Sequence, residues 1–202
     1  MIRLAESYYL NQDVVGLARD MLGKVLVTHI GGIVAAGLIA ETEAYAGIND
    51  RASHAFGERR TNRNEVMYHR GGKSYVYLCY GIHHLFNIVT HDEGIPHAIL
   101  IRSIIPIEGI EAQLRRRSQT IWKPSVTQGP GKVSQAMGIT VKENGVSLLG
   151  NRIWVEDRGV DIPKEIVNIS PRIGIDYAGE DASLPYRFYI TYEGLKNHHL
   201  IF

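Results

Sequence analysis

The strongest constraint on the fold is a pair of extended segments joined by a two-glycine turn. Residues 24–30 are rich in β-branched side chains, Gly31 and Gly32 can both adopt positive φ, and residues 33–45 continue the extended pattern. Two such segments around a short glycine turn predict a β-hairpin, because the turn matches the twist of the flanking strands. A sheet is therefore expected to begin early in the chain.

Similar signals predict the remaining elements. Extended segments are expected at residues 73–80, 82–90, 97–105, 152–156 and 186–192, with a turn at Gly81 between the first two. Helices are expected from a cap at Asn11 or Asp13 to Gly23, and at residues 108–117 and 130–137. Between them, the loop at 47–72 is long enough to be functional and has room for a short helix. We expect one α+β domain over residues 1–202, with a mostly antiparallel curved sheet, flanking helices and a protruding β-hairpin.

The charge balance excludes a molecule that is basic overall. The chain has 202 residues, with 22 Lys and Arg against 21 Asp and Glu, for a formal net charge of +1. Any nucleic-acid face must therefore be local. Residues 59–73 carry five basic side chains against one acid, Glu65, and such a cluster is either a solvated loop or part of a nucleic-acid interface.

Cysteine usage and apolar runs bear on the compartment. Cys79 is the one cysteine of the sequence, so no intrachain disulfide can form, as is typical of a reducing compartment. No run reaches the roughly 18 apolar residues that a membrane span needs, and residues 1–11 do not have the pattern of a secretory signal. We expect a protein of the cytoplasm or the chromosome, with no membrane partner.

A candidate catalytic group lies on the second strand of the first hairpin. Strand alternation places Glu41, Glu43 and Tyr45 on one face, and the small side chains at 40, 42 and 44 on the other, which can pack in the core. A glutamate on a strand is either a solvent-facing residue or a functional carboxylate, and the spacing leaves both open.

Aromatic residues gather in the same part of the sequence: Tyr45, His54, Tyr75, Tyr77 and Tyr80. Strand tyrosines are either half-buried sheet residues or ligand contacts. Tyr80 differs from the others because it precedes Gly81 at the predicted tip of a hairpin. A flat side chain at an exposed tip favours insertion between stacked bases.

A set of collinear motifs extends over nearly the whole chain, from about residue 23 to residue 189. In order, the motifs are Glu41-Thr42-Glu43-Ala44-Tyr45, His54, Thr61-Asn62-Arg63-Asn64, Tyr75-Val76-Tyr77-Leu78-Cys79-Tyr80-Gly81, Asn87, Leu100-Ile101-Arg102, Gly129-Pro130-Gly131-Lys132, Arg172-Ile173-Gly174 and Leu184-Pro185-Tyr186-Arg187-Phe188-Tyr189. Together they resemble the alkyladenine (3-methyladenine) DNA glycosylase family.

The resemblance implies a division of roles. Glu43 would position and deprotonate the attacking water, and Arg102 would orient that water and stabilise the ionised carboxylate. Substrate-binding residues are implied at Tyr45, His54, Tyr77, Asn87, Ile173 and Gly174, with Asn87 discriminating at the edge of the base. DNA-binding residues are implied at Tyr80, Gly81, Arg63 and Lys132, with Tyr80 filling the gap left in the duplex.

Physical chemistry independently supports this division. A glycosidic carbon inside a duplex is out of reach, so the nucleotide must rotate out at a cost of a few kcal/mol, which stacking of about 1 to 3 kcal/mol per base can offset. An alkylated purine leaves readily, so a carboxylate can stabilise the positive sugar and accept a proton from water. The ordinary glutamate pKa of about 4.3 and the neighbouring Arg102 favour an ionised Glu43. No lysine occupies the pocket segments, so we expect a monofunctional enzyme without strand cleavage.

No cofactor or metal is predicted. The 129–132 segment does not complete a P-loop pattern, because residues 126 and 133 are valines, and no nucleotide cofactor is implied. His83, His91 and His97 lack the spacing of a metal site, and the roles of these histidines and of His84 stay open. After Gly81 the sequence departs from the family pattern, which leaves substrate breadth open.

Three functions remain in competition. The first is a monomeric DNA glycosylase that releases alkylated or deaminated purines such as 3-methyladenine, 7-methylguanine or hypoxanthine from duplex DNA. The second is a non-catalytic damaged-DNA-binding protein in which Glu43 is structural. The third is a free-nucleoside hydrolase, which the basic segment and Tyr80 at a tip disfavour. Steep weakening of binding with salt is expected of the first two only.

Overall fold

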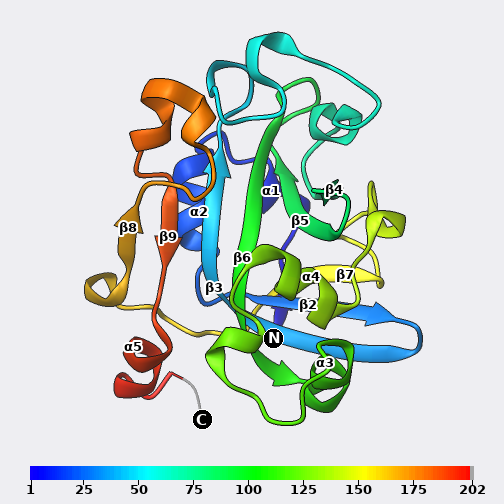
Figure 1. The fold of residues 1–202 in the computed structure, drawn as a ribbon, viewed down its shortest axis with the longest axis vertical. Coiled ribbons are helices and arrows are strands. Elements are labelled where there is room, and N and C mark those ends of the chain that lie inside the picture. The colour runs from blue at the N-terminus through cyan, green and yellow to red at the C-terminus, as the bar shows by residue number, and fades with distance from the viewer. Residues whose placement is uncertain (201–202) are drawn as a thin grey trace.

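The chain folds around one antiparallel sheet, shown in Figure 1. The computed structural model describes residues 1–200. The strands are β1 (Ile2–Arg3), β2 (Val25–Ile30), β3 (Ile33–Tyr45), β4 (Lys73–Cys79), β5 (His83–Thr90), β6 (His97–Glu108), β7 (Ile153–Asp157), β8 (Asn168–Ser170) and β9 (Arg187–Tyr189). Their order is β1-β7-β2-β3-β6-β5-β4, with β9 joining β3 to β8. The predicted α+β class with a mostly antiparallel curved sheet is confirmed.

Short helices connect and cover the strands. The α-helices are α1 (Glu6–Tyr9), α2 (Val14–Asp20), α3 (Ile110–Arg116), α4 (Pro130–Met137) and α5 (Tyr192–Asn197). The 3-10 helices are η1 (Gly47–Asn49), η2 (Phe56–Glu58), η3 (Glu65–Tyr68), η4 (Pro124–Val126), η5 (Val141–Glu143), η6 (Lys164–Ile166) and η7 (Asp176–Ser183). Among them, η1 to η3 lie within the long loop that the sequence predicts, at one end of β3 and β6 (Figure 1).

Strand β3 is the centre of the sheet and is paired on both edges. Its first half pairs with β2 through the Gly31-Gly32 turn, in which both residues have positive φ. Its second half lies between β6 and β9, which pairs with it from Glu41 to Glu43. A strand held by backbone hydrogen bonds on both edges is rigid, so side chains on this part of β3 have little freedom to move.

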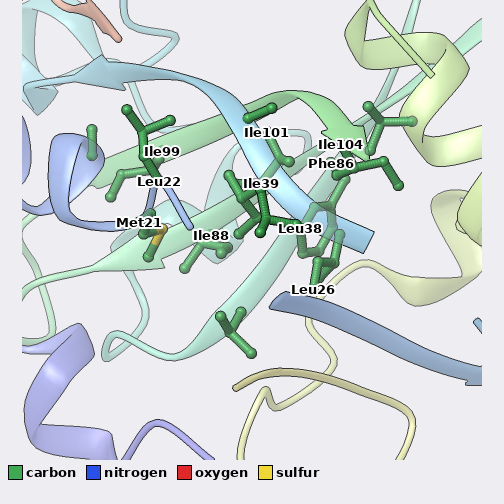
Figure 2. Packing of buried hydrophobic residues seen from close by; sticks show 14 of the residues in the cluster. Met21, Leu22, Leu26, Leu38, Ile39, Phe86, Ile88, Ile99, Ile101 and Ile104 are labelled. Atoms are coloured by element: carbon green, nitrogen blue, oxygen red, sulfur yellow. The ribbon is translucent and has the colours of Figure 1, made fainter. Parts of the chain in front are cut away.

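The core lies where β3, β5 and β6 pack against α2 (Figure 2). Ile39, Ile88, Ile99 and Ile101 are fully buried, and Met21 packs among them from the end of α2. Each fully buried side chain of this size contributes about 1.5 to 3 kcal/mol to folding. This core supports the sheet directly beneath the face that carries the candidate site.

Most local signals gave the correct element. Asp13 caps α2 by accepting a hydrogen bond from the Gly16 N–H at 2.8 Å, and α4 begins at the predicted proline. The boundaries predicted for the helix at residues 108–117 are wrong, because β6 continues to Glu108 and α3 begins at Ile110. Gly109, with a φ of 66°, then turns the chain into α3.

The predicted strand over 186–192 is also wrong in part. Only β9 is extended, and α5 begins at Tyr192 after Thr191, whose side chain accepts from the Gly194 N–H at 3.0 Å. The alternating aromatic residues there have the pattern of a longer strand, but Thr191 caps α5 and the chain becomes helical. Within residues 1–200, no helix has the length and apolar character required to cross a membrane.

Candidate active site

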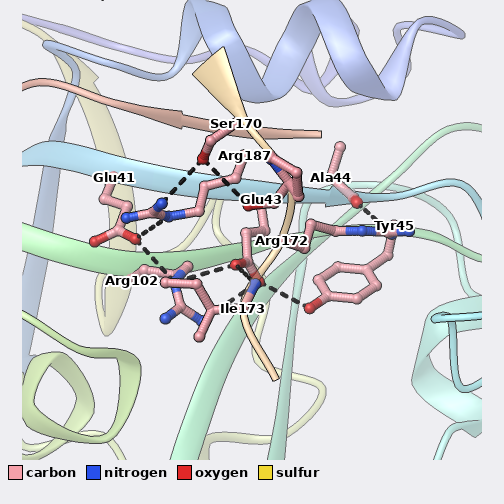
Figure 3. A network of polar contacts seen from close by, with 10 residues as sticks. Glu41, Glu43, Ala44, Tyr45, Arg102, Ser170, Arg172, Ile173 and Arg187 are labelled. Atoms are coloured by element: carbon pink, nitrogen blue, oxygen red, sulfur yellow. Dashed lines mark hydrogen bonds and ion pairs between the residues drawn. The ribbon is translucent and has the colours of Figure 1, made fainter. Parts of the chain in front are cut away.

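Glu43 lies on the central strand, with its carboxylate fully buried and held from three sides (Figure 3). The Ile173 N–H donates to Oε1 at 2.8 Å and the Tyr45 hydroxyl donates to Oε2 at 2.8 Å. Arg102 approaches both oxygens, at 3.3 Å from Nε to Oε1 and 3.4 Å from Nη1 to Oε2. The carboxylate therefore has a fixed orientation.

A pair of β-bulges brings Arg102 to Glu43. The register passes from Ile39 opposite Ile104 to Glu41 opposite Ser103, and then to Thr42 opposite Ile101, so that Arg102 is the extra residue of β6. A bulge leaves one residue outside the ladder and changes the direction of its side chain. The carbonyl of Arg102, released from the ladder, accepts from the Gly129 N–H at 2.7 Å instead.

Opposing effects set the acidity of Glu43. Burial raises the pKa of this carboxyl. Arg102, the Ile173 N–H and the Tyr45 hydroxyl lower it, and the nearby Glu41 charge raises it. The net direction is upward from the ordinary value. Arg102 thus acts in the direction that the sequence suggests, but desolvation outweighs it, and a carboxylate so placed accepts a proton more readily than an exposed one.

A cavity of about 430 Å³ lies next to the residues that hold this carboxylate, and Glu43 itself is buried behind its wall. Its lining includes every residue predicted to bind substrate: Tyr45, His54, Tyr77, Asn87, Ile173 and Gly174. Arg102 also contributes to the wall, so three of the lining residues contact Glu43 directly. The size of the cavity is that of a small-molecule site. Because residues of the wall contact Glu43, the tertiary structure brings the candidate carboxylate and the candidate wall together.

Aromatic rings form one side of the cavity. The His54 and Tyr77 rings meet edge to face with centroids 4.7 Å apart, and His54 Nδ1 lies 2.7 Å from the Tyr75 hydroxyl oxygen. Burial, with smaller effects of Arg63 and Arg59, lowers the pKa of His54 to about 4. The imidazole is therefore neutral at physiological pH and forms part of an uncharged wall.

The loop that carries His54 is held in place by a buried asparagine. Asn64 donates to the carbonyls of His54 and Arg59 at 2.9 and 2.8 Å, and accepts from the Thr61 N–H at 2.7 Å. One amide thus ties three parts of the loop together, which explains how an irregular segment can position a ring in the cavity wall.

Asn87 lies at the base of the wall on β5 and is nearly buried. Its side-chain amide donates to the Tyr75 carbonyl at 3.1 Å and, less closely, to the Leu85 carbonyl at 3.4 Å. Within residues 1–200 its side-chain oxygen accepts no hydrogen bond. The orientation of the side chain is therefore set by the sheet, and its acceptor remains available to a ligand.

The hairpin of β4 and β5 ends in an exposed tyrosine at the rim of the cavity. Tyr80 is 91% exposed and has a φ of 51°, and Gly81 follows with a φ of 74°. The Ile82 N–H donates to the Cys79 carbonyl at 3.1 Å and closes the turn. Two successive positive φ values are those of a type I′ hairpin turn, so the turn itself presents Tyr80 to solvent.

The basic segment is smaller as a patch than its composition indicates. Arg60 forms an ion pair with Glu65, and Arg70 pairs with two acids outside the segment, whereas Arg63 has no carboxylate partner in the part of the chain that the structure describes. Arg63 lines the cavity with its guanidinium 5.0 Å from the Tyr77 ring. Lys132 lies outside the cavity in the first turn of α4, where it donates to the Ser125 carbonyl at 3.0 Å.

Sequence reasoning missed the support beneath this site. Arg172 and Asp50 form a fully buried ion pair with nitrogen to oxygen distances of 2.5 and 2.8 Å, and Arg172 also donates to the Ala44 carbonyl at 2.9 Å. The pair fixes the residue directly before Ile173. The motif contains Arg172, but its acidic partner is 122 residues away, and no local signal connects them.

Tyr177 is a second residue that the sequence did not single out. It lines the cavity, is 70% exposed, and donates from its hydroxyl to the Ala52 carbonyl at 3.3 Å. Its position in an irregular segment, η7, gives no strand or helix pattern from which it could have been found.

The three histidines His83, His91 and His97 do not form a single cluster. His91 and His97 meet edge to face with centroids 5.1 Å apart, while His83 lies near the hairpin tip against the start of α4. Residues 1–200 contain no group of three or more potential metal-ligating His, Cys, Asp or Glu side chains.

Comparison with known proteins shows the family of the chain. The family model of methylpurine-DNA glycosylase (MPG) matches residues 8–194. A relative from Chlamydia abortus, named "Putative 3-methyladenine DNA glycosylase", is 48% identical over 186 residues, which cover 92% of this chain and 96% of the relative. Relatives of the same name from Bacillus cereus and Clostridium acetobutylicum are 44% and 41% identical, cover 93% and 94% of this chain, and are each covered to 94%.

These matches define the class of the protein, a DNA glycosylase, which is a hydrolase that binds DNA and acts in its repair. Within that class, the chain belongs to the methylpurine-DNA glycosylase family. The glycosylase hypothesis, the first of the three that the sequence left in competition, is confirmed at this level.

Proposed function

We propose that the protein rotates alkylated or deaminated purines out of duplex DNA and hydrolyses their N-glycosidic bond with a water activated by Glu43. The substrates would include 3-methyladenine, 7-methylguanine and hypoxanthine. One observation carries the proposal: a buried carboxylate is fixed by Ile173 and Tyr45, and both of these residues line a ring-lined cavity large enough for a purine.

The first step is extrusion of the damaged nucleotide. Unstacking and unpairing require a few kcal/mol. Tyr80 can enter the base stack from its exposed turn, and the rings of Tyr45, His54 and Tyr77 can stack on the extruded base, which is worth about 1 to 3 kcal/mol per base. Insertion and stacking together offset the unfavourable step.

The second step is hydrolysis. Water attacks C1′ of the deoxyribose, its oxygen forms the new bond to that carbon, and one of its protons passes to Glu43. The carbon–nitrogen bond breaks, and the purine leaves with the electron pair. The negative carboxylate stabilises the positive charge that develops on the sugar. Arg102 contacts the carboxylate and would also orient the water. The upward pKa shift of Glu43 favours proton transfer from water.

Selection among bases would depend on hydrogen bonding at the edge of the base and on stacking of its charged ring against the cavity wall. Asn87 presents its side-chain oxygen at the cavity wall, where it can accept a hydrogen bond from a purine or exclude an exocyclic group. A cationic alkylated purine would also stack well against neutral tyrosine and histidine rings. The neutral state of His54 removes a repulsive charge from that wall.

The DNA surface would be local and electrostatic. Arg63 lines the cavity together with Tyr80, and Lys132 follows Gly131, which lies against His83 of the same hairpin. Phosphate contacts of such side chains weaken as salt rises. Among the described residues 1–200, no lysine lines the cavity, which supports base release without strand cleavage. We expect the protein to act as a monomer on the chromosome, without a cofactor.

A panel of duplexes, each with one damaged purine, tests the proposal. Free base is measured under single-turnover conditions with the native protein and with Glu43→Gln. We expect release of the three purines named above, and a loss of about 10²- to 10⁴-fold in the variant with DNA binding retained. The matched control is Glu143→Gln, because Glu143 is also a buried carboxylate paired with an arginine but lies outside the site. Unchanged release by Glu43→Gln would refute the mechanism, and faster release from free nucleosides would favour a nucleoside hydrolase.

A further inference from the structure

A second buried carboxylate, Glu41, lies on the far side of Arg102 from Glu43 (Figure 3). Its Oε1 accepts from Arg102 Nε at 3.0 Å and from Arg187 Nε at 2.7 Å. Arg187 is itself held by Ser170, whose Oγ accepts from Nη1 at 2.9 Å. Arg102 is therefore shared between two carboxylates, and Glu41 is shared between two arginines.

The two glutamates differ in how they are connected to the aromatic cavity. Neither lines it, but Glu43 contacts three residues that do, Tyr45, Arg102 and Ile173, whereas within residues 1–200 Glu41 is hydrogen-bonded to Arg102 alone among the lining residues. Glu41 and Arg187 line a second cavity of about 290 Å³ instead, and Arg102 does not contribute to it. Glu41 thus has no route to a base in the aromatic cavity and can influence the reaction only through Arg102.

The geometry around Arg102 shows what Glu41 does to it. Arg102 Nε lies 3.0 Å from Glu41 but 3.3 Å from Glu43. A guanidinium freed from Glu41 would close on Glu43 to form the shorter, two-bonded pair that arginine and carboxylate prefer. Such a pair would compete with the Ile173 N–H for Oε1 and would neutralise the carboxylate more completely.

We propose that Glu41 and Arg187 form a positioning pair that holds Arg102 back from Glu43 and so keeps the Glu43 carboxylate reactive. The inference rests on the proposed role of Glu43 as the base that activates water. Neither member of the pair touches the substrate, and their effect passes through the guanidinium of Arg102.

All charged and polar groups that face Glu43 enter this balance. They are Glu41 and Tyr45 on β3, Arg102 on β6, Arg187 opposite Glu43 on β9, and Arg172 with the Ile173 N–H on the segment before η7. Among them, the Glu41 charge raises the pKa of Glu43, whereas Arg102 lowers it. Removal of the Glu41 charge therefore shifts the acidity of Glu43 in a predictable direction.

The test is the pH dependence of single-turnover base release, with enzyme saturating over a duplex that carries one hypoxanthine. For Glu41→Gln we expect a rate lower by about 10- to 100-fold at neutral pH and an acid limb displaced to lower pH, because Glu43 then ionises more readily. Duplex affinity should not change, since Glu41 lies outside the aromatic cavity.

Arg187→Gln should displace the acid limb of the pH profile in the opposite direction. It therefore keeps the test informative if Glu41→Gln fails to fold. Without Arg187, the Glu41 charge is less neutralised, so the acid limb should move to higher pH. The matched control is Glu143→Gln, which removes a buried arginine-paired carboxylate that lines neither cavity and should leave the limb where it is. A purely structural role would lower the amount of active protein without moving the limb in either variant.

Failure of this inference is distinguishable from failure of the proposed function. If Glu43→Gln abolishes release but Glu41→Gln and Arg187→Gln have the native pH profile, the positioning role is wrong and the base assignment stands. If Glu43→Gln releases base normally, the base assignment is wrong, and the positioning role is overturned with it.

Discussion

Two buried acid–arginine pairs lie beside Tyr45, and they differ in how closely the arginine approaches its carboxylate. In the pair of Asp50 and Arg172, the guanidinium reaches both carboxylate oxygens at 2.5 and 2.8 Å, and two backbone N–H groups donate to the same carboxylate. In the pair of Glu43 and Arg102, the approaches are 3.3 and 3.4 Å, and the arginine is shared with another carboxylate.

The difference separates a structural ion pair from a reactive one. Short, two-bonded contacts with additional donors stabilise a charge where it is and leave it little capacity for chemistry. Longer contacts under strong desolvation leave the Glu43 carboxylate with a raised pKa and with an arginine that it shares with Glu41. We infer that the first pair holds the cavity wall in place and the second performs the reaction.

Among the variants that test this comparison of the two pairs, Arg102→Gln has the largest expected effect, and the effect is on activity. Glu43 would lose the cation that lowers its pKa, so less of it would be ionised at neutral pH, and the water would lose an orienting group. We expect base release to fall by about 10²- to 10³-fold, measured by single-turnover kinetics. The free energy of unfolding should fall much less than in Asp50→Asn, because Glu43 can take up a proton. Equal losses of stability in the two variants would contradict the distinction between the pairs.

The largest expected effect on stability comes from Asp50→Asn. The change leaves Arg172 buried without a counter-charge, and such a loss typically lowers the free energy of unfolding by about 3 to 5 kcal/mol. Urea denaturation measures the effect. Asp13→Asn is the control, because asparagine caps a helix as well as aspartate does. A stability close to that of the native protein would show that this pair is not structural.

The smallest expected effect comes from Tyr45→Phe, because the change removes a single hydrogen bond. Tyr45 is informative because it contacts both pairs. Its hydroxyl donates to Glu43, and its ring lies 4.9 Å from the Arg172 guanidinium. Phenylalanine retains the ring contact and removes the hydrogen bond, which is worth about 0.5 to 1.5 kcal/mol. Because that bond lowers the pKa of Glu43, the acid limb of base release should move to higher pH, while stability changes little. A large loss of stability with no movement of the limb would reverse this assignment.

Local signals in the sequence predicted those parts of the site that depend on short-range rules. Strand alternation placed Glu43 and Tyr45 on one face, with Ala44 in the core on the other. Gly81 predicted the turn that has Tyr80 at its tip, and the structure has that turn, with positive φ at both residues. Such predictions succeed because each depends on the few residues around it.

The aromatic wall was predictable as a set of residues but not as a surface. His54 belongs to a loop without strand or helix periodicity, and its place depends on the hydrogen bonds of Asn64. Tyr177 and Asp50 left no signal at all, because each is defined by a contact with a distant segment. The order of the motifs along the chain was the one indication from the sequence that the segments of the wall lie in one site.

By itself, the sequence determined the α+β class, the early hairpin, the exposed tyrosine at a tip and the identity of the candidate carboxylate. Only the tertiary structure decided how that carboxylate is held, since its hydrogen bond from Ile173 joins residues 130 positions apart and Arg102 reaches it through a bulge in β6. The physical reason is that strand register and desolvation are properties of the packed sheet. A shift of one residue would turn Arg102 to the other face, and the pKa of Glu43 is raised only when the surrounding chain excludes water.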